Sequence, residues 1–238
     1  MNNVPVTAIE RRFQVGERVG EVSALLLSPE VTEWLLVLAH GAGAGMRHAF
    51  MEQLSERLAA RGIATFRYQF PYMEAGRRRP DPPGVLAATV RAAVTAARAA
   101  APGVPLLAGG KSMGGRITSH AVVQSGLQGV EGLVFFGFPL HALGRPSKDR
   151  AGHLGEIALP MLFLQGTRDG LADLDLVRGL CGRLGARATL HIVHGADHSF
   201  HMLKRSGRTD DSALDELADE TSAWTAGLEA IRELGERS

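Results

Sequence analysis

A strand-like run that ends in a glycine-rich turn is the feature that most constrains the fold of this chain. Residues Pro105–Ala108 are apolar, Gly110-x-Ser112-x-Gly114 follows directly, and a helical pattern comes next. A side chain on so tight a turn sits at a strained backbone conformation, and the residues two before and two after it must be small. The serine then lies at a strand end and at a helix N-terminus, where negative charge is favoured. Ser112 is therefore a candidate nucleophile; the alternative is a glycine-rich turn with an incidental serine.

Apolar runs alternate with helical patterns along most of the chain. Strands are expected at Trp34–Ala39, Ile63–Tyr68, Pro105–Ala108, Leu133–Phe136, Met161–Leu164 and Ala188–Val193. Helices are expected at Phe50–Ala60 and Gly84–Ala101, after Ser112, and at Asp173–Leu184 and Ser212–Leu234. Continuous apolar runs are typical of strands buried on both faces, so the alternation predicts an α/β fold with a mostly parallel sheet and helices on both faces. No linker divides the chain, so residues 1–238 are predicted to form a single domain.

Three other segments complete the predicted architecture. Phe13–Gly16 and Val22–Leu27 are expected to form an antiparallel edge, because no helix-length segment separates them. Phe70–Pro83 contains four prolines and is expected to be a loop. The connection Phe138–Glu156 is too short for a full helical cap, which predicts a minimal cap and a fairly open site.

Composition excludes several classes of function. Of the 238 residues 45% are hydrophobic and 21% charged, and the net charge is +1, so neither nucleic acid nor an anionic membrane is an expected partner. Residues Met1–Gln14 lack an apolar signal segment, and arginines interrupt the Ala-rich run at Val85–Ala101, so a cytoplasmic protein is expected. Cys181 is the single cysteine, which excludes an internal disulfide. The histidines lack metal-ligand spacing, so no metal and no cofactor is predicted, and the oligomeric state is left open.

Three reactive side chains follow three different predicted strands. Ser112, Asp169 and His198 come after Pro105–Ala108, Met161–Leu164 and Ala188–Val193 respectively. In open α/β sheets, chemistry gathers at the carboxyl ends of the strands. A serine hydroxyl needs a base, usually a histidine that a carboxylate holds in one tautomer. The alternatives to Asp169 are Asp173 and Asp175, which suit a helix start, and the alternatives to His198 are His194, His201 and the adjacent Asp197.

The chain resembles the α/β-hydrolase superfamily in four segments that occur in that superfamily's order. These are His40–Gly43, Gly110–Gly115, Gln165–Asp169 and Ala196–Phe200. The compact size and small cap are similar to the dienelactone-hydrolase-like branch. The segment Phe70–Asp81 resembles a small group of predicted hydrolases related to the hydrolase-like domain of a nuclear acetyltransferase-complex subunit.

The resemblance implies a role for each of these residues. Ser112 would be the nucleophile, His198 the general base and then acid, and Asp169 the orienting carboxylate. The oxyanion hole would be formed by the N–H of Met113 and by an N–H of the early loop, with Ala42 as the candidate and Gly43 as its rival. His40 is expected to hold that loop by hydrogen bonding.

The Arg77-Arg78-Arg79 run admits two interpretations. It is either a solvated loop partly neutralised by Glu74 and Asp81, or it places an arginine at the mouth of the site. We expect Arg77 to be the arginine that contacts an anionic group of the substrate. Tyr72 is a candidate for lining the substrate pocket, and packing in the hydrophobic core is an equally good interpretation of it. Lys111 is expected to fill the variable position of the turn and to point to solvent.

The expected function is that of a serine hydrolase for a small-molecule ester, thioester or similar acyl bond, acting through an acyl-enzyme on Ser112. Two alternatives stay open at this point. One is a non-catalytic interaction module that retains the hydrolase fold, because fold does not fix function. The other is an acyltransferase, in which an alcohol or peroxide takes the acyl group in place of water.

Overall fold

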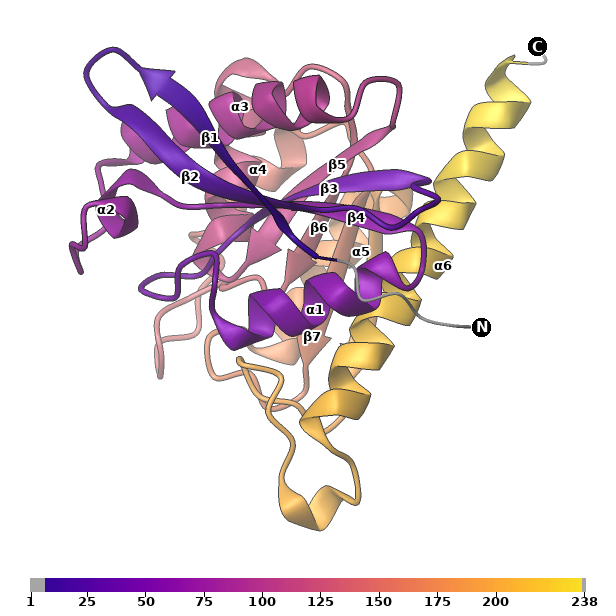
Figure 1. The fold of residues 1–238 in the computed structure, drawn as a ribbon. Helices are drawn as coiled ribbons and strands as arrows, with labels where there is room; N and C mark the ends of the chain where they lie inside the picture. Colours follow the sequence, from indigo (N-terminus) through magenta and orange to yellow (C-terminus); the bar gives the residue numbers. More distant parts are fainter. Residues whose placement is uncertain (1–6, 237–238) are drawn as a thin grey trace.

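The computed structural model describes residues 7–236, which form an eight-stranded sheet flanked by helices (Figure 1). The strands are β1 Ile9–Gly16, β2 Gly20–Leu27, β3 Trp34–Ala39, β4 Ile63–Tyr68, β5 Leu106–Lys111, β6 Val130–Phe136, β7 Met161–Gly166 and β8 Ala188–Val193. Their spatial order is β1-β2-β4-β3-β5-β6-β7-β8, and every pair from β4 to β8 is parallel. The predicted α/β class with a mostly parallel sheet is confirmed.

The first two strands form the antiparallel edge that the sequence predicts. β1 pairs with β2 through a register that places Phe13 opposite Val22, and β2 runs antiparallel to β4. β1 begins four residues earlier than expected, at Ile9, because its first residues are exposed and largely polar and so carry no apolar signal. Charged side chains on such an outer strand discourage pairing with another chain.

The helices cover both faces of the sheet. They are α1 Ala49–Ala59, α2 Pro71–Glu74, α3 Pro83–Ala100, α4 Met113–Ser125, α5 Leu174–Leu184 and α6 Asp210–Glu236, with short 3-10 turns η1 Gly152–Glu156, η2 Gly185–Arg187 and η3 Lys204–Ser206. α3, α4 and α5 pack on one face, and α1 and α6 pack on the other (Figure 1). No helix within residues 7–236 has the length and apolar character needed to cross a bilayer.

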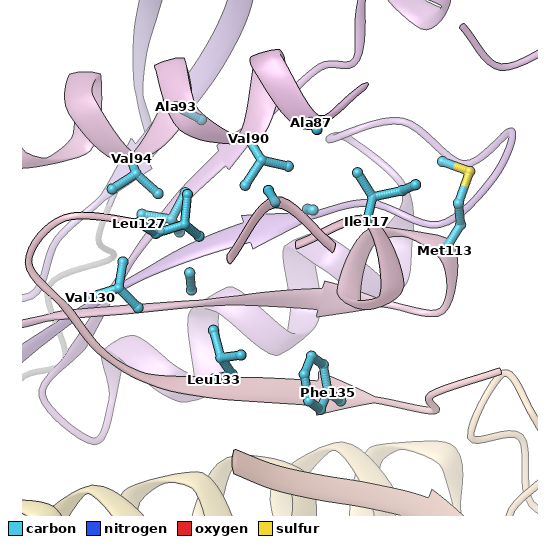
Figure 2. Packing of buried hydrophobic residues seen from close by; sticks show 14 of the residues in the cluster. Ala87, Val90, Ala93, Val94, Met113, Ile117, Leu127, Val130, Leu133 and Phe135 are labelled. Carbon is cyan, nitrogen blue, oxygen red and sulfur yellow. The ribbon is translucent and has the colours of Figure 1, made fainter. Parts of the chain in front are cut away.

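The central strands are apolar at every position because each face meets a helix layer. In β3, Leu35 and Val37 belong to the core beneath α3 and α4, whereas Leu36 and Leu38 belong to the core beneath α1 and α6. Side chains of a strand alternate between faces, so burial on both sides removes the usual polar positions. Figure 2 shows the first of these cores, with Val90 of α3 directed toward the sheet and α4.

β5 extends three residues beyond the expected end at Ala108. Its glycines belong to the strand because neighbouring backbones approach them closely. A Cβ atom on Gly109 would lie 1.9 Å from the Val134 carbonyl oxygen, and one on Gly110 would lie 2.4 Å from the Ala39 carbonyl oxygen. Residues that look like the start of a turn therefore belong to the strand, at positions where the neighbouring backbone leaves no room for a side chain.

Two connections contain more structure than the sequence suggests. The predicted loop Phe70–Pro83 begins with the single helical turn α2, in which Pro71 occupies the first position that proline tolerates. The connection between β6 and β7 contains the 3-10 turn η1 as its only helical element among the described residues. The predicted minimal cap is confirmed, and Ser112 is half-buried, not sealed beneath a lid.

Candidate active site

Ser112 occupies the sharp turn between β5 and α4. Its φ is +52° and its ψ is −118°, a conformation that side chains other than glycine rarely adopt. The turn closes only because its neighbours lack side chains: a Cβ on Gly114 would lie 2.4 Å from the Ala39 carbonyl oxygen. The predicted need for small residues on both sides of Ser112 is thus met by close backbone contacts.

His198 connects Ser112 to Asp169 through two hydrogen bonds. Its Nε2 lies 2.8 Å from the Ser112 Oγ, and its Nδ1 lies 2.7 Å from the Asp169 Oδ2. The three residues come from the ends of β5 and β7 and from the loop after β8. The Asp169 side chain is fully buried and the His198 side chain is 24% exposed, so a small molecule can approach the histidine from solvent.

Three of the alternative acids and bases, Asp173, Asp197 and His201, are engaged elsewhere. The Asp173 carboxylate caps α5 by accepting from the N–H groups of Asp175 and Leu176. His201 pairs with Asp210, and the Asp197 carboxylate accepts from the N–H groups of Ser199 and His201. These contacts leave Asp169 and His198 as the pair that faces Ser112.

Gln165 is a contact of Asp169 that sequence reasoning missed. Its Nε2 donates to the Asp169 Oδ2, and the Leu171 N–H donates to the Asp169 Oδ1 at 2.8 Å. Both bonds hold the carboxylate in a fixed orientation toward His198. The signal was present, because Gln165 is the one polar side chain in the otherwise apolar run Met161–Gly166.

The loop after β3 lies beside Ser112 and is held by His40. The His40 Nδ1 donates to the Gly41 carbonyl oxygen at 2.7 Å, and its Nε2 accepts from the Phe70 N–H at 3.2 Å. These partners require the Nδ1–H tautomer of the neutral ring. Burial lowers the pKa of His40 to about 4, which keeps the ring neutral near pH 7. His40 thus makes the loop-holding contacts expected of it.

The two candidates for the early-loop donor differ in their contacts. The Gly43 N–H donates to the Tyr72 hydroxyl at 3.0 Å and is already occupied. Within residues 7–236, neither the Ala42 N–H nor the Met113 N–H donates a hydrogen bond. Met113 is the first residue of α4, where an N–H has no helical acceptor. The free donors are therefore those of Ala42 and Met113.

Tyr72 and Arg77 are both anchored within their own loop. Tyr72 is fully buried, and its N–H donates to the Asp81 Oδ2 at 2.7 Å. Arg77 pairs with the Asp81 Oδ1 at 2.6 Å, although 54% of its side chain stays exposed. Direct contact of either residue with a substrate stays a prediction. Arg78 and Arg79 are exposed and form no ion pair with any described residue.

Lys111 does not point to solvent, contrary to the expectation from its position in the turn. Its Nζ donates to the His198 carbonyl oxygen at 2.6 Å and lies 5.8 and 5.5 Å from the ring centres of Phe50 and Phe200. Burial lowers its pKa to about 8, while Asp169 and Asp197 oppose that shift. Lys111 therefore ties the turn of the nucleophile to the loop of His198, a long-range contact that its local pattern does not reveal.

Comparison with known proteins identifies the family. A sequence model described as "Alpha/beta hydrolase domain" matches residues 32–226. The chain belongs to the alpha/beta hydrolase family. Within residues 7–236 of this hydrolase-family chain, no cluster of three or more His, Cys, Asp or Glu side chains is arranged to hold a metal ion.

Solved structures share the fold of this alpha/beta hydrolase family member over nearly its whole length. Dienelactone hydrolase from Anabaena variabilis has a TM-score of 0.73 and 19% identity, covering 94% of this chain and 99% of that one. A lidless α/β serine hydrolase from Xanthomonas campestris has a TM-score of 0.69 and 20% identity, covering 92% and 97%. A cold-adapted esterase from an Arctic intertidal metagenomic library has a TM-score of 0.65 and 19% identity, covering 94% and 96%. Because the sequence identities are low, the similarity to these structures is evidence for the fold alone.

Proposed function

We propose that this chain is a serine hydrolase that cleaves a small ester, thioester or similar acyl bond. The observation that carries the proposal is His198, whose two ring nitrogens contact the Ser112 Oγ and the Asp169 carboxylate at 2.8 and 2.7 Å. A serine hydroxyl attacks a carbonyl only when a base accepts its proton, and this arrangement supplies that base in one tautomer.

The reaction proceeds in two halves. The Ser112 Oγ attacks the substrate carbonyl carbon while the His198 Nε2 takes its proton, and the same imidazolium then protonates the leaving alcohol or thiol. Water, deprotonated by His198, attacks the resulting acyl-enzyme and releases the acid. The Asp169 carboxylate orients His198 and stabilises the imidazolium, with Gln165 and the Leu171 N–H holding its two oxygens.

The tetrahedral oxyanion is held by the N–H groups of Ala42 and Met113. Neither N–H donates to another residue in the described range 7–236, and the α4 N-terminus adds a favourable dipole. Each such donor typically contributes about 3 kcal/mol to transition-state stabilisation. The half-buried Ser112 and the small cap suit substrates that are small or that project into solvent.

We also propose that the chain belongs to the small group of predicted hydrolases that the segment Phe70–Asp81 resembles. Membership of that small group implies a hydrolase fold and a catalytic triad, and it leaves the substrate open. What supports it is that the segment contacts the loop of the oxyanion donors, through the Phe70 N–H to His40 and the Tyr72 hydroxyl from Gly43. Binding of a stable partner protein together with no reaction toward serine-directed probes would instead favour the non-catalytic interaction module.

Steady-state hydrolysis of p-nitrophenyl acetate tests the proposal. We expect Ser112→Ala to lower kcat by about a thousandfold or more, because the acyl-enzyme can no longer form. Ser125→Ala is the matched control, since Ser125 lies at the opposite end of α4 and contacts Arg91. Product analysis with added alcohol separates hydrolysis from acyl transfer. Turnover in the Ser112 variant equal to that of the Ser125 variant would overturn the proposal.

A further inference from the structure

The main chain of His198 is held by a single hydrogen bond. Within residues 7–236, its carbonyl oxygen accepts from the Lys111 Nζ at 2.6 Å, and the His198 backbone forms no other hydrogen bond there. The neighbouring Asp197, in contrast, donates through its N–H to the His201 carbonyl oxygen at 3.2 Å and accepts from the His201 N–H at 3.0 Å. Lys111 is therefore the contact that fixes the main chain at the base itself.

The ammonium group of Lys111 is held by aromatic rings and not by a carboxylate. It lies over the rings of Phe50 and Phe200, which stack on each other with centres 5.8 Å apart and an interplanar angle of 16°. It forms no ion pair with any residue that the structure describes. A positive charge strengthens both a hydrogen bond and an attraction to a ring face, most of all where water is excluded. The charge of Lys111 therefore serves its contacts with the turn of His198.

The turn that follows His198 is strained. Phe200 is buried and adopts a φ of +64°, although it is not a glycine. Such a conformation persists only where the surroundings impose it. Lys111 contacts both the His198 carbonyl oxygen and the Phe200 ring, so one ammonium group restrains this turn on both sides of Ser199.

Gly137 leaves room for the ammonium group beside the imidazole. This glycine directly follows β6, and a Cβ atom on it would lie 3.2 Å from the Lys111 Nζ and 3.5 Å from the His198 Nδ1. The two nitrogens therefore border the same small space at the end of β6. The His198 Nδ1 is also the ring nitrogen that contacts Asp169, so the ammonium lies close to the bond that orients the ring.

We propose that Lys111 is a positioning residue for the base: its ammonium group holds the turn of His198 so that the imidazole reaches Ser112 and Asp169 at the same time. This proposal rests on the proposed function of Ser112. Lys111 itself transfers no proton. A displacement of about 1 Å at a reacting group can lower a rate by about 100-fold, so loss of this contact acts on the chemical step.

Hydrolysis of p-nitrophenyl acetate by two lysine variants provides the first test. Lys111→Met keeps an unbranched side chain and removes the charge and the N–H donors. We expect it to lower kcat by about 10- to 100-fold with little change in KM, because proton transfer depends on the position of His198. Lys204→Met, on the exposed turn η3, is the matched control and keeps the wild-type kcat. A wild-type kcat in Lys111→Met would overturn the positioning role.

The pH profile of kcat tests whether the charge of Lys111 is used. Burial lowers the pKa of Lys111 to about 8, the carboxylates of Asp169 and Asp197 oppose that shift, and the His198 ring borders the same space. Above this pKa the amine is neutral and loses its attraction to the rings. The ratio of the wild-type kcat to that of Lys111→Met should therefore fall as pH rises from 7 to 10. A ratio that does not change with pH would overturn the role of the charge.

Proton NMR of the bond between His198 and Asp169 separates this proposal from the proposed function. The Nδ1–H proton in such a bond gives a strongly downfield signal, which is assigned by its absence in His198→Asn. We expect this signal in the wild-type and Lys204→Met proteins and its loss or broadening in Lys111→Met, even if no ester is hydrolysed.

The two proposals fail in different ways in this experiment. An unchanged signal in Lys111→Met, together with hydrolysis that requires Ser112, would overturn the positioning role alone. Loss of the signal in Lys111→Met, together with a wild-type protein that hydrolyses no ester, would support the positioning role and overturn the proposed function alone.

Discussion

At the scale of single residues, the site combines two strained backbone positions with side chains that hold them in place. Ser112 adopts a positive φ, and Phe200, in the loop of His198, is the other non-glycine residue that does so within the described chain. Such strain persists only where the surroundings impose it. Lys111 supplies one such restraint, since it contacts the Phe200 ring and the His198 carbonyl oxygen.

The hydroxyl of Tyr72 offers a test of how the oxyanion loop is positioned. Tyr72→Phe keeps the buried ring but removes the acceptor of the Gly43 N–H, so the loop that carries Ala42 is less fixed. We expect kcat for p-nitrophenyl acetate to fall about tenfold with little change in KM, because the oxyanion contact forms only in the transition state. The melting temperature serves as the control for folding. A Tyr72→Phe protein with wild-type kcat would show that this hydrogen bond does not position the donor.

The sequence identifies those site residues that directly follow a predicted strand. Ser112, Asp169 and His198 could be proposed because parallel strands end at one edge of the sheet. The contact of Lys111 could not be predicted, because the direction of its side chain depends on a distant segment, whereas Gln165 stands out as the one polar side chain of its apolar run. For Lys111 that contact spans 87 positions in the sequence.

At the scale of elements, the glycines of β5 show why the boundary of a strand can be mistaken for a turn. Glycine carries no apolar or branched signal, so Gly109 and Gly110 looked like the start of the turn. The structure places both within the strand because the carbonyl oxygens of Val134 and Ala39 leave no room for a Cβ atom. The turn α2 was missed for a related reason, since prolines indicate a loop although Pro71 opens a helix.

Substitution of Gly109 tests this packing directly. The Cβ of alanine at Gly109 would lie 1.9 Å from a backbone oxygen, so the sheet has to shift. We expect Gly109→Ala to lower the free energy of unfolding in urea by about 3 kcal/mol. Gly84→Ala in α3 is the matched control, because nothing lies within 4 Å of the added atom. Equal stability of the two variants would contradict the close approach of β5 and β6.

At the scale of the whole molecule, the sheet brings distant segments to one edge. Ser112 follows β5 and His198 follows β8, and a hydrogen bond joins them across 86 positions of sequence although β6 and β7 lie between the two strands. The fold class was predictable because strands and helices differ in apolar periodicity. The spatial order β2-β4-β3-β5 could not be predicted from the apolar pattern, because it depends on which buried faces pack together.

The buried His40 is expected to make the free energy of unfolding depend on pH. Its pKa falls to about 4 in the folded protein from 6.5, so between these values the unfolded chain binds more protons. The free energy of unfolding therefore rises with pH: the contribution of His40 is fully present above pH 6.5 and is lost as pH falls toward 4. A shift of this size corresponds to about 3 kcal/mol.

Urea unfolding between pH 4.5 and pH 7 measures this contribution. We expect His40→Asn to be less stable than the wild-type protein at pH 7, because the Phe70 and Gly41 contacts are altered. Its stability should also depend less steeply on pH, by up to about 1.4 kcal/mol per pH unit. Parallel pH profiles for the two proteins would contradict a neutral buried His40.

The most direct test of Ser112 as the nucleophile is the position of a covalent adduct. A fluorophosphonate probe reacts with a serine that a histidine activates, and peptide mapping by mass spectrometry locates the product. We predict a single adduct on Ser112 in the wild-type and Ser125→Ala proteins, and none in Ser112→Ala. An adduct on another residue, or equal labelling of the Ser112→Ala protein, would contradict the assignment of Ser112 as the nucleophile.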